Sequence, residues 1–341
     1  MRLRTLAALA LAAAGTTAYQ LQWRRDLRAI RSDPEWSELN RDLAHETRTV
    51  TSGDGTQLHV ETFGPADAPP IVLVHGWVEA IRLWHHQIRD LAGEFRVIAY
   101  DQRGHGSSRM PATAAYTDAA LAGDLNAVLD ACLRPGERCV VAGHSMGGMS
   151  IVAWAGRNAD RVSQRLAGAV LVNTGMSEMP SHSKLFGDHA GPHLHEWLAP
   201  AVLASPLRAP TMLEPISLRA VRRIALASDA SLAKVAFCHQ MFLTAPAPVR
   251  RGFGRMMIPL DLMPAVASLA VPTIVIASEH DLLLPPWHAE QLAAALPIVD
   301  EHVVLPGIGH IATIEAPDEV TSRLLRLARR VHAQPQAAVA G

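Results

Sequence analysis

The sequence predicts an α/β fold with a mostly parallel sheet flanked by helices and a helical cap inserted between two strands. Three observations support this prediction: short, wholly apolar runs recur along the chain, segments of helical periodicity separate them, and one proline-rich stretch interrupts the alternation. Strands of a parallel sheet appear as continuous apolar runs because helices cover both of its faces. The 341 residues are enough for one large domain with a sizeable core.

Seven segments have the length and composition of strands. The first alternates, and we expect polar Gln57, His59 and Glu61 to point outward and the residues between them to point into the core. The other six are apolar runs that end in glycine or polar residues. In chain order the segments are TQLHVETFG (56–64), PPIVLVHG (69–76), FRVIAYDQRG (95–104), RCVVAGHS (138–145), LAGAVLVNTG (166–175), VPTIVIASEHD (271–281) and EHVVLPGIGH (301–310).

Helical segments lie between these strands. In TDAALAGDLNAVLDACL (117–133), apolar side chains recur at helical spacing, and Arg28 to Leu43 forms an amphipathic stretch that we also expect to be helical. From 176 to 262 no strand pattern is visible, while prolines separate helical pieces such as SLAKVAFCHQMFL. We therefore predict one domain over 45–332 with a cap inserted at about 176–262, followed by a flexible tail over 333–341.

The first 30 residues are expected to be separate from this domain. A basic start precedes an apolar run from Leu6 to about Tyr19, which is short for a membrane span and suits the core of a signal peptide. Arginines then follow, and positive charge tends to stay on the cytoplasmic side of a membrane. Three interpretations stay open: a signal peptide, a retained membrane segment, or a helix on the membrane surface. Export or membrane contact is favoured over a purely cytoplasmic location.

The composition argues against several partners. A net charge of −1 gives no basic field for nucleic acid. Cys132, Cys139 and Cys238 are expected to be small buried residues, with a Cys132–Cys139 bridge as the alternative for an exported protein. Four cap histidines could suggest a metal site, but no metal-binding spacing accompanies them, so we expect neither metal nor cofactor. They are His182, His189, His193 and His195.

The segment CVVAGHSMGG (139–148) carries the main functional prediction. Gly143 to Gly147 matches G-x-S-x-G, the strained strand-to-helix turn that exposes a nucleophilic serine. The glycines allow strand and helix to approach closely around Ser145. An apolar strand precedes the motif and a helical segment follows it, so the context that the motif requires is present.

A serine nucleophile needs a base and a carboxylate that orients the base. In this architecture the chain order is serine, acid, histidine. Asp281 follows a predicted strand, and His310 follows the last one after a Gly-Ile-Gly approach. Glu279 is the competing acid, but Asp281 is preferred because it lies in the turn beyond the strand. Donors for an oxyanion are expected from the backbone N–H groups of Met146 and Trp77.

Five motifs together resemble the α/β-hydrolase family in order and spacing, from about Leu58 to Leu327. They are LVHGW, YDQRGHGSS, GHSMGG, ASEHDLLLPP and PGIGHIATIEAPDEV. The resemblance implies the α/β-hydrolase fold, a Ser145–Asp281–His310 triad and an oxyanion hole at Trp77 and Met146. It also implies a structural turn at 101–106, with Arg103 and His105 as scaffold. Ser278 stands where the family has glycine, a small departure.

The resemblance also limits the reactions that we expect of this chain. Relatives that open epoxides or remove halides use aspartate at the elbow, where this chain has serine. Epoxide-opening relatives also use tyrosines of the cap to polarise the ring oxygen, and the predicted cap holds none of the three tyrosines of this chain. The resemblance therefore does not favour either activity. We expect hydrolysis of a small to medium apolar ester through an acyl-enzyme on Ser145. Alternatives with the same triad are cofactor-free haloperoxidase or perhydrolase activity and carbon–carbon bond hydrolysis. A non-catalytic binding protein on this fold is the alternative of another class. Neither the substrate nor the oligomeric state follows from the sequence.

Overall fold

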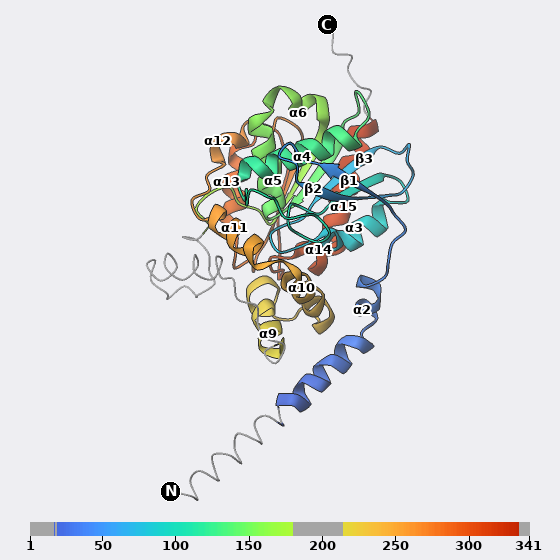
Figure 1. Ribbon diagram of the computed structural model, residues 1–341, viewed down its shortest axis with the longest axis vertical. Coiled ribbons are helices and arrows are strands. Elements are labelled where there is room, and N and C mark those ends of the chain that lie inside the picture. Colours follow the sequence, from blue (N-terminus) through green and yellow to red (C-terminus); the bar gives the residue numbers. More distant parts are fainter. Residues whose placement is uncertain (1–16, 18, 180–213, 334–341) are drawn as a thin grey trace, which may run out of the picture.

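The computed structural model describes residues 17, 19–179 and 214–333. Its centre is an eight-stranded sheet in the order β1-β2-β4-β3-β5-β6-β7-β8 (Figure 1). The predicted fold class is confirmed. The strands are β1 (Glu46–Thr51), β2 (Gln57–Phe63), β3 (Pro70–Val74), β4 (Arg96–Tyr100), β5 (Cys139–His144), β6 (Leu166–Val172), β7 (Thr273–Ser278) and β8 (Val299–Leu305).

The sheet is parallel from β4 to β8 and antiparallel at its other edge. β1 pairs with β2 and β2 pairs with β4 in antiparallel register, whereas the remaining neighbours are parallel. The seven segments expected as strands correspond to β2 through β8. β1 was not among them, because its sequence ETRTVT has a single buried residue, Val50, and gives no apolar signal.

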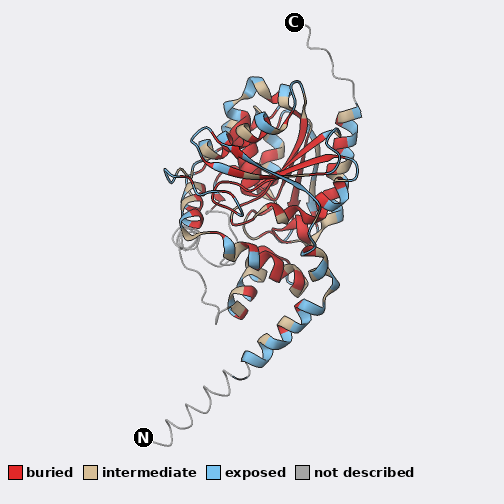
Figure 2. Cartoon of the chain, turned by 45° about the vertical axis from the view of Figure 1, so that its right-hand side comes forward, coloured by how far each residue is buried: buried red, intermediate tan, exposed pale blue. Residues whose placement is uncertain are grey.

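Both faces of the sheet are buried along its central strands, as the apolar runs predict, whereas the edge strands β1 and β8 are largely exposed or half-buried. In β3, Ile71 and Leu73 belong to one core cluster, while Val72 and Val74 belong to the other. Successive side chains of a strand point to opposite faces, so a run without polar residues requires cover on both sides. Figure 2 shows the strands as the buried centre of the molecule. In β2, Leu58 and Val60 are fully buried, in agreement with the predicted alternation.

Helices supply the cover on the two sides. The cluster that contains Val72 includes residues of α4 (Asp118–Cys132), α5 (Met146–Arg157) and α13 (Trp287–Ala295). The other cluster includes residues of η1 (Ile81–Trp84), α3 (His85–Leu91), α14 (Ala312–Glu315) and α15 (Pro317–Ala333). α6 (Ala159–Arg165) leads into β6. The helix predicted over 117–133 therefore forms as α4, capped by the Thr117 side chain.

The described residues between β6 and β7 are helical and contain no strand. They include α9 (Glu214–Ala225), α10 (Leu232–Thr244), α11 (Ala247–Met257) and α12 (Met263–Val266). In Figure 1, α9 and α10 lie together below the sheet, and α11 lies beside them. Residues 180–213, including the four cap histidines, lie outside the described residues. The cap boundaries 176–262 therefore remain a prediction, as does the tail over 333–341.

The chain before β1 forms two helices rather than one. A helix over residues 19–32 projects from the body (Figure 1), and α2 (Pro34–Leu39) follows it. The single helix expected from Arg28 to Leu43 is wrong at Asp33, whose side chain caps the N-terminus of α2 ahead of a proline. An N-cap residue leaves the helical conformation, and proline favours the first helical turn, so the break is local. Among the described helices, none has the length and apolarity needed to cross a membrane.

A buried ion pair ties the loop after β4 to α4. Arg103 is 1% exposed, and its Nε and Nη2 atoms each donate to the Asp124 carboxylate over 2.6 Å. Its Nη1 atom reaches Asp54 over 2.7 Å. This pair holds the loop at 101–106 against the helix and agrees with the scaffold role expected for Arg103.

Replacement of Arg103 by methionine should lower the free energy of unfolding by about 3–5 kcal/mol, because it leaves the Asp124 carboxylate buried without its partner. Urea unfolding followed by circular dichroism measures this change. Replacement of Arg329 by methionine breaks the exposed pair with Glu94 and should change stability little. Equal effects of the two substitutions would contradict the role assigned to the buried pair.

Candidate active site

The strand ends bring the predicted residues to one edge of the sheet. Ser145 follows β5 directly, Asp281 follows β7, and His310 follows β8. These strands and β6 between them run parallel, so their carboxyl ends lie on the same side. In open α/β sheets, ligands bind at this edge.

Ser145 has a strained backbone at the turn between β5 and α5. Its φ is 50° and its ψ is −118°, a conformation that non-glycine residues rarely adopt. The N–H of Ser145 donates to the Val172 carbonyl over 3.0 Å, and the Thr174 hydroxyl donates to the Ser145 carbonyl over 2.8 Å. At Gly147 a Cβ atom would collide with the Val74 carbonyl. Gly147, two residues after the serine, is therefore required by the close approach of α5 to β3.

Asp281 and His310 form a hydrogen-bonded pair. Asp281 Oδ2 lies 2.7 Å from His310 Nδ1, and both residues are buried. The other oxygen, Oδ1, accepts the N–H groups of Leu283 and Leu284, each over 2.9 Å. Glu279 is 55% exposed and instead accepts the Gly307 N–H. The structure thus brings Asp281, rather than Glu279, to the histidine.

Asn173 is a further contact of the acid that the sequence analysis did not single out. Its Nδ2 atom donates to Asp281 Oδ2 over 3.1 Å, and its own φ is 45°. The Asp281 carboxylate therefore accepts four hydrogen bonds, which fix both of its oxygens. A polar residue directly after the apolar run of β6 is the signal that could have indicated Asn173.

The loop of His310 lies against the serine turn. His144, the residue before Ser145, places its ring 4.9 Å from the His310 ring, and its Nε2 lies 2.9 Å from the His310 carbonyl. Among the described residues, no hydrogen bond joins Ser145 Oγ to His310. In sites without substrate this contact is often long and shortens when the complex forms.

The end of α9 also contacts the loop of His310. The His310 N–H donates to the Ala225 carbonyl over 2.9 Å, and the Ala227 N–H donates to Glu315 over 2.6 Å. Glu315 also accepts the Ile311 N–H. Burial raises the pKa of Glu315. At this point the helices between β6 and β7 support the histidine directly.

The loop after β3 carries the predicted oxyanion donor. The Gly76 N–H is bound by Glu79, and the Val78 N–H by His105 Nε2 over 3.1 Å. Between them, the Trp77 N–H has no acceptor among the described residues. Met146 begins α5, and the first N–H groups of a helix have no intrahelical acceptor. In the part of the chain that the structure describes, neither predicted donor has a hydrogen-bond acceptor.

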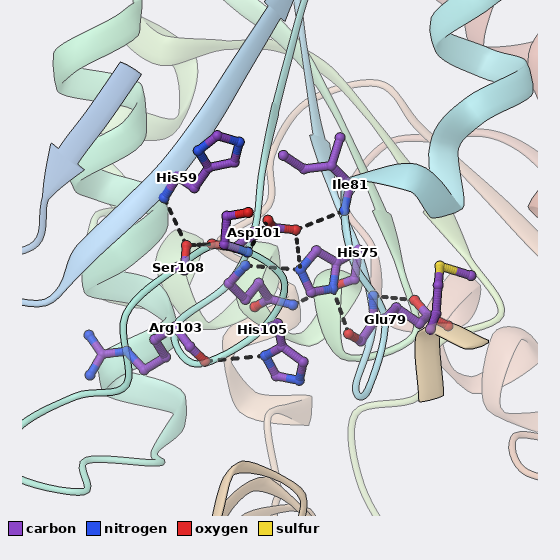
Figure 3. A network of polar contacts seen from close by, with 12 residues as sticks. His59, His75, Glu79, Ile81, Asp101, Arg103, His105 and Ser108 are labelled. Carbon is purple, nitrogen blue, oxygen red and sulfur yellow. Dashed lines mark hydrogen bonds and ion pairs between the residues drawn. The ribbon is translucent and has the colours of Figure 1, made fainter. Parts of the chain in front are cut away.

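The segment 101–106 is joined to this loop by hydrogen bonds. His75 Nε2 accepts the Gln102 N–H over 2.9 Å, and Asp101 accepts the Ile81 N–H over 2.9 Å. Figure 3 shows His75, Asp101 and His105 gathered against the loop that carries Glu79 and Ile81. Val78, with a φ of 58°, is a second strained residue here. Strained backbone at several strand ends is characteristic of functional sites.

The described residues contain no group of three or more histidine, cysteine or acidic residues placed to hold a metal ion. Cys132, Cys139 and Cys238 are free thiols, and burial raises the pKa of each.

The comparisons with known proteins agree with the fold. Residues 71–323 match the model of the alpha/beta hydrolase family. The chain belongs to this family. A relative from Variovorax paradoxus, provisionally named carbamate hydrolase RutD, is 30% identical over 81% of this hydrolase and 97% of its own length. Other relatives carry the names of a chloroperoxidase and of epoxide hydrolases, each matched over less than half of this chain.

Solved structures place the hydrolase near esterases. A thermophilic esterase from Thermogutta terrifontis is 26% identical, with a TM-score of 0.67 over 84% of this chain and 100% of its own. The enol-lactonase from Burkholderia xenovorans LB400 is 27% identical, with a TM-score of 0.66 over 82% of this chain and 99% of its own. Both of those proteins are named for reactions at ester groups.

The contribution of His105 to the free energy of unfolding should fall as the pH falls from about 6.5 to about 4. Burial lowers the pKa of His105 to about 4, so the unfolded chain binds this proton over that range while the folded chain does not. Replacement of His105 by glutamine removes the titrating group, so the difference in stability between wild type and variant should change by on the order of 3 kcal/mol over this range. Urea unfolding at several pH values measures the difference between wild type and variant, and parallel curves would contradict this assignment.

Proposed function

We propose that the chain is a serine hydrolase that cleaves carboxylic esters through an acyl-enzyme on Ser145. One observation carries the proposal: a buried Asp281–His310 pair at 2.7 Å faces the edge of the sheet where a strained turn presents a serine. This is the geometry that turns a weak hydroxyl nucleophile into a reactive one.

In the first half-reaction, Ser145 Oγ attacks the ester carbonyl carbon while His310 Nε2 takes the hydroxyl proton. Asp281 holds Nδ1–H of the same ring and stabilises the imidazolium that forms. The negative charge that develops on the carbonyl oxygen is stabilised by the N–H groups of Trp77 and Met146. The C–O bond then breaks, the alcohol leaves with the proton from His310, and Ser145 keeps the acyl group.

In the second half-reaction, water attacks the acyl carbon and His310 takes one of its protons. The tetrahedral species collapses by breaking the bond to Ser145 Oγ, which recovers the proton from His310. The products are the carboxylic acid and the free enzyme. No atom changes its oxidation state, so the cycle needs no redox cofactor.

Apolar surroundings support an apolar substrate. Met146 belongs to the core cluster that also contains Met149, Met176, Met179 and Leu284, and Trp77 packs against the same cluster. Met176 and Met179 follow β6 in the chain, and Leu284 follows Asp281. We expect a small or medium acyl or alcohol group.

The serine at position 145 also argues against epoxide hydrolysis. An epoxide-opening relative would need an aspartate nucleophile, and position 145 is serine. The described residues beyond β6 contain no tyrosine that could hold a ring oxygen. Peracid or carbon–carbon chemistry would use the same triad, and no described contact favours either.

Replacement of Ser145 by alanine should abolish hydrolysis of p-nitrophenyl esters, with a loss of kcat of at least about 1,000-fold. The thermal unfolding midpoint should stay within a few degrees, because only one hydroxyl is removed. A fluorophosphonate should label Ser145 in the wild type and leave the variant unlabelled. Wild-type rates in the alanine variant would overturn the proposal.

Replacement of Asp281 by asparagine should lower kcat by about 10,000-fold, because the amide no longer stabilises the imidazolium and favours the wrong tautomer. Glu279 provides the matched control, since it lies two residues away and is exposed. Its replacement by glutamine should leave kcat within about twofold. Steady-state kinetics on one ester compare the two variants, and a larger loss at Glu279 would assign the acid to that residue.

A further inference from the structure

We propose that Glu79 and His144 form a positioning pair that holds three parts of the site together: the oxyanion loop, the serine turn and the histidine loop. This inference rests on the proposed function. It assigns a role to two residues that do not touch the substrate in the proposed mechanism.

Glu79 joins the oxyanion loop to the serine turn through one oxygen atom. Its Oε2 accepts the Gly76 N–H over 2.5 Å and lies 3.0 Å from His144 Nδ1. Glu79 is 3% exposed and His144 is fully buried, so water does not compete for these contacts. A Cβ atom at position 76 would lie 2.6 Å from the same Oε2 atom and 3.1 Å from His144 Nδ1. A Cβ atom at this position would therefore push the Glu79 carboxylate away from its present contacts.

His144 extends the connection to the histidine loop. Its Nε2 contacts the His310 carbonyl over 2.9 Å. A carbonyl can only accept, so Nε2 must carry a proton. The carboxylate oxygen at Nδ1 already accepts the Gly76 N–H, and it pairs best with a second N–H donor. The contacts therefore favour a doubly protonated imidazolium that donates at both nitrogens.

The surroundings of His144 agree with a charged ring. Glu79 is the carboxylate in contact with it, Asp281 lies farther off in the acid loop, and both raise the pKa of His144 against its burial. The other titratable groups that face it are the rings of His310 and His75. The His75 pKa is lowered well below its usual range, mainly by burial, so the His75 ring is neutral beside His144.

The pair has a consequence for the pH dependence of the reaction. When His144 loses its second proton, its Nδ1 lone pair faces the Glu79 oxygen and the contact becomes repulsive. A glutamine at position 79 could still accept both hydrogen bonds through its amide oxygen. It carries no charge, so it would hold the imidazolium less strongly, and the pair would open at a lower pH.

The decisive experiment compares Glu79→Gln with wild type over about pH 6 to pH 9. The ratio of the two kcat values, each per fluorophosphonate-titrated site, should fall by about tenfold as the pH rises. The ratio removes any titration that the two enzymes share and excludes misfolded protein. A ratio that is independent of pH would overturn the proposal. Glu79→Met leaves no acceptor and should lose kcat at every pH.

Leu327→Ala is the control for a merely structural effect. Leu327 is fully buried in α15 and packs near Gly168, at the start of β6 and so at the end of the strand opposite the site, and the cavity that alanine leaves should lower the unfolding midpoint. Its kcat per titrated site should stay near wild type, and its ratio to wild type should not change with pH. If Leu327→Ala reproduces the behaviour of Glu79→Gln, the effect is general destabilisation and the proposal is wrong.

A spectroscopic measurement tests the pair without using activity. ¹⁵N NMR of the wild type, with the ring signals of His144 assigned by their loss in His144→Gln, should show both ring nitrogens protonated at neutral pH. One unprotonated ring nitrogen would overturn the proposal. If instead the wild type neither reacts with the fluorophosphonate nor cleaves esters while His144 is doubly protonated, the pair stands and the proposed function fails.

Discussion

The backbone of Ser145 is held in a conformation that costs on the order of 1–3 kcal/mol, and the surrounding sheet must supply the contacts that keep it there. Its N–H is bound by the carbonyl of Val172 at the end of β6, and its carbonyl by the hydroxyl of Thr174 just beyond. These contacts exist because β5 and β6 run parallel and end at the same level. The acid and histidine loops then reach the serine turn from the next two strands.

Three buried histidines support this arrangement in different ways. His75 and His105 accept backbone N–H groups and are neutral, because burial outweighs the charges near them. His144 is equally buried, but Glu79 lies beside it and raises its pKa. Histidine therefore supports the site as a neutral hydrogen-bond acceptor at positions 75 and 105 and, in our proposal, as a charged hydrogen-bond donor at position 144. The groups next to each ring decide whether it is neutral or charged.

Family membership and chemistry rest on different residues. The sheet, the elbow and the order of the strand-end residues place the chain among alpha/beta hydrolases, whose members also carry the names of peroxidases and epoxide hydrolases. A shared fold positions a nucleophile and a base without choosing the substrate. In our proposal, the serine at position 145 and the apolar cluster that contains Met146 favour ester hydrolysis, and an esterase and an enol-lactonase are among the solved structures that resemble this chain.

The sequence by itself determined the sheet and the strand-to-helix turn at Ser145. An apolar run predicts a strand that is buried on both faces, and closely spaced glycines predict a tight turn, so both features depend on neighbouring residues. Neighbouring residues predicted seven of the eight strands that the structure describes, the turn at Ser145, and the positions of Asp281 and His310 at strand ends. β1 was missed because ETRTVT is exposed on most of its length and has no apolar pattern.

Only the tertiary structure decided which other polar groups meet around the predicted Asp281–His310 pair. Glu79 and His144 are 65 residues apart, Asn173 and Asp281 are 108 apart, and His144 and the His310 carbonyl are 166 apart. No local pattern encodes such pairs, since each depends on the register of parallel strands and the path of the loops between them. Burial of these groups together is what gives each contact its strength, and burial is a property of the folded chain.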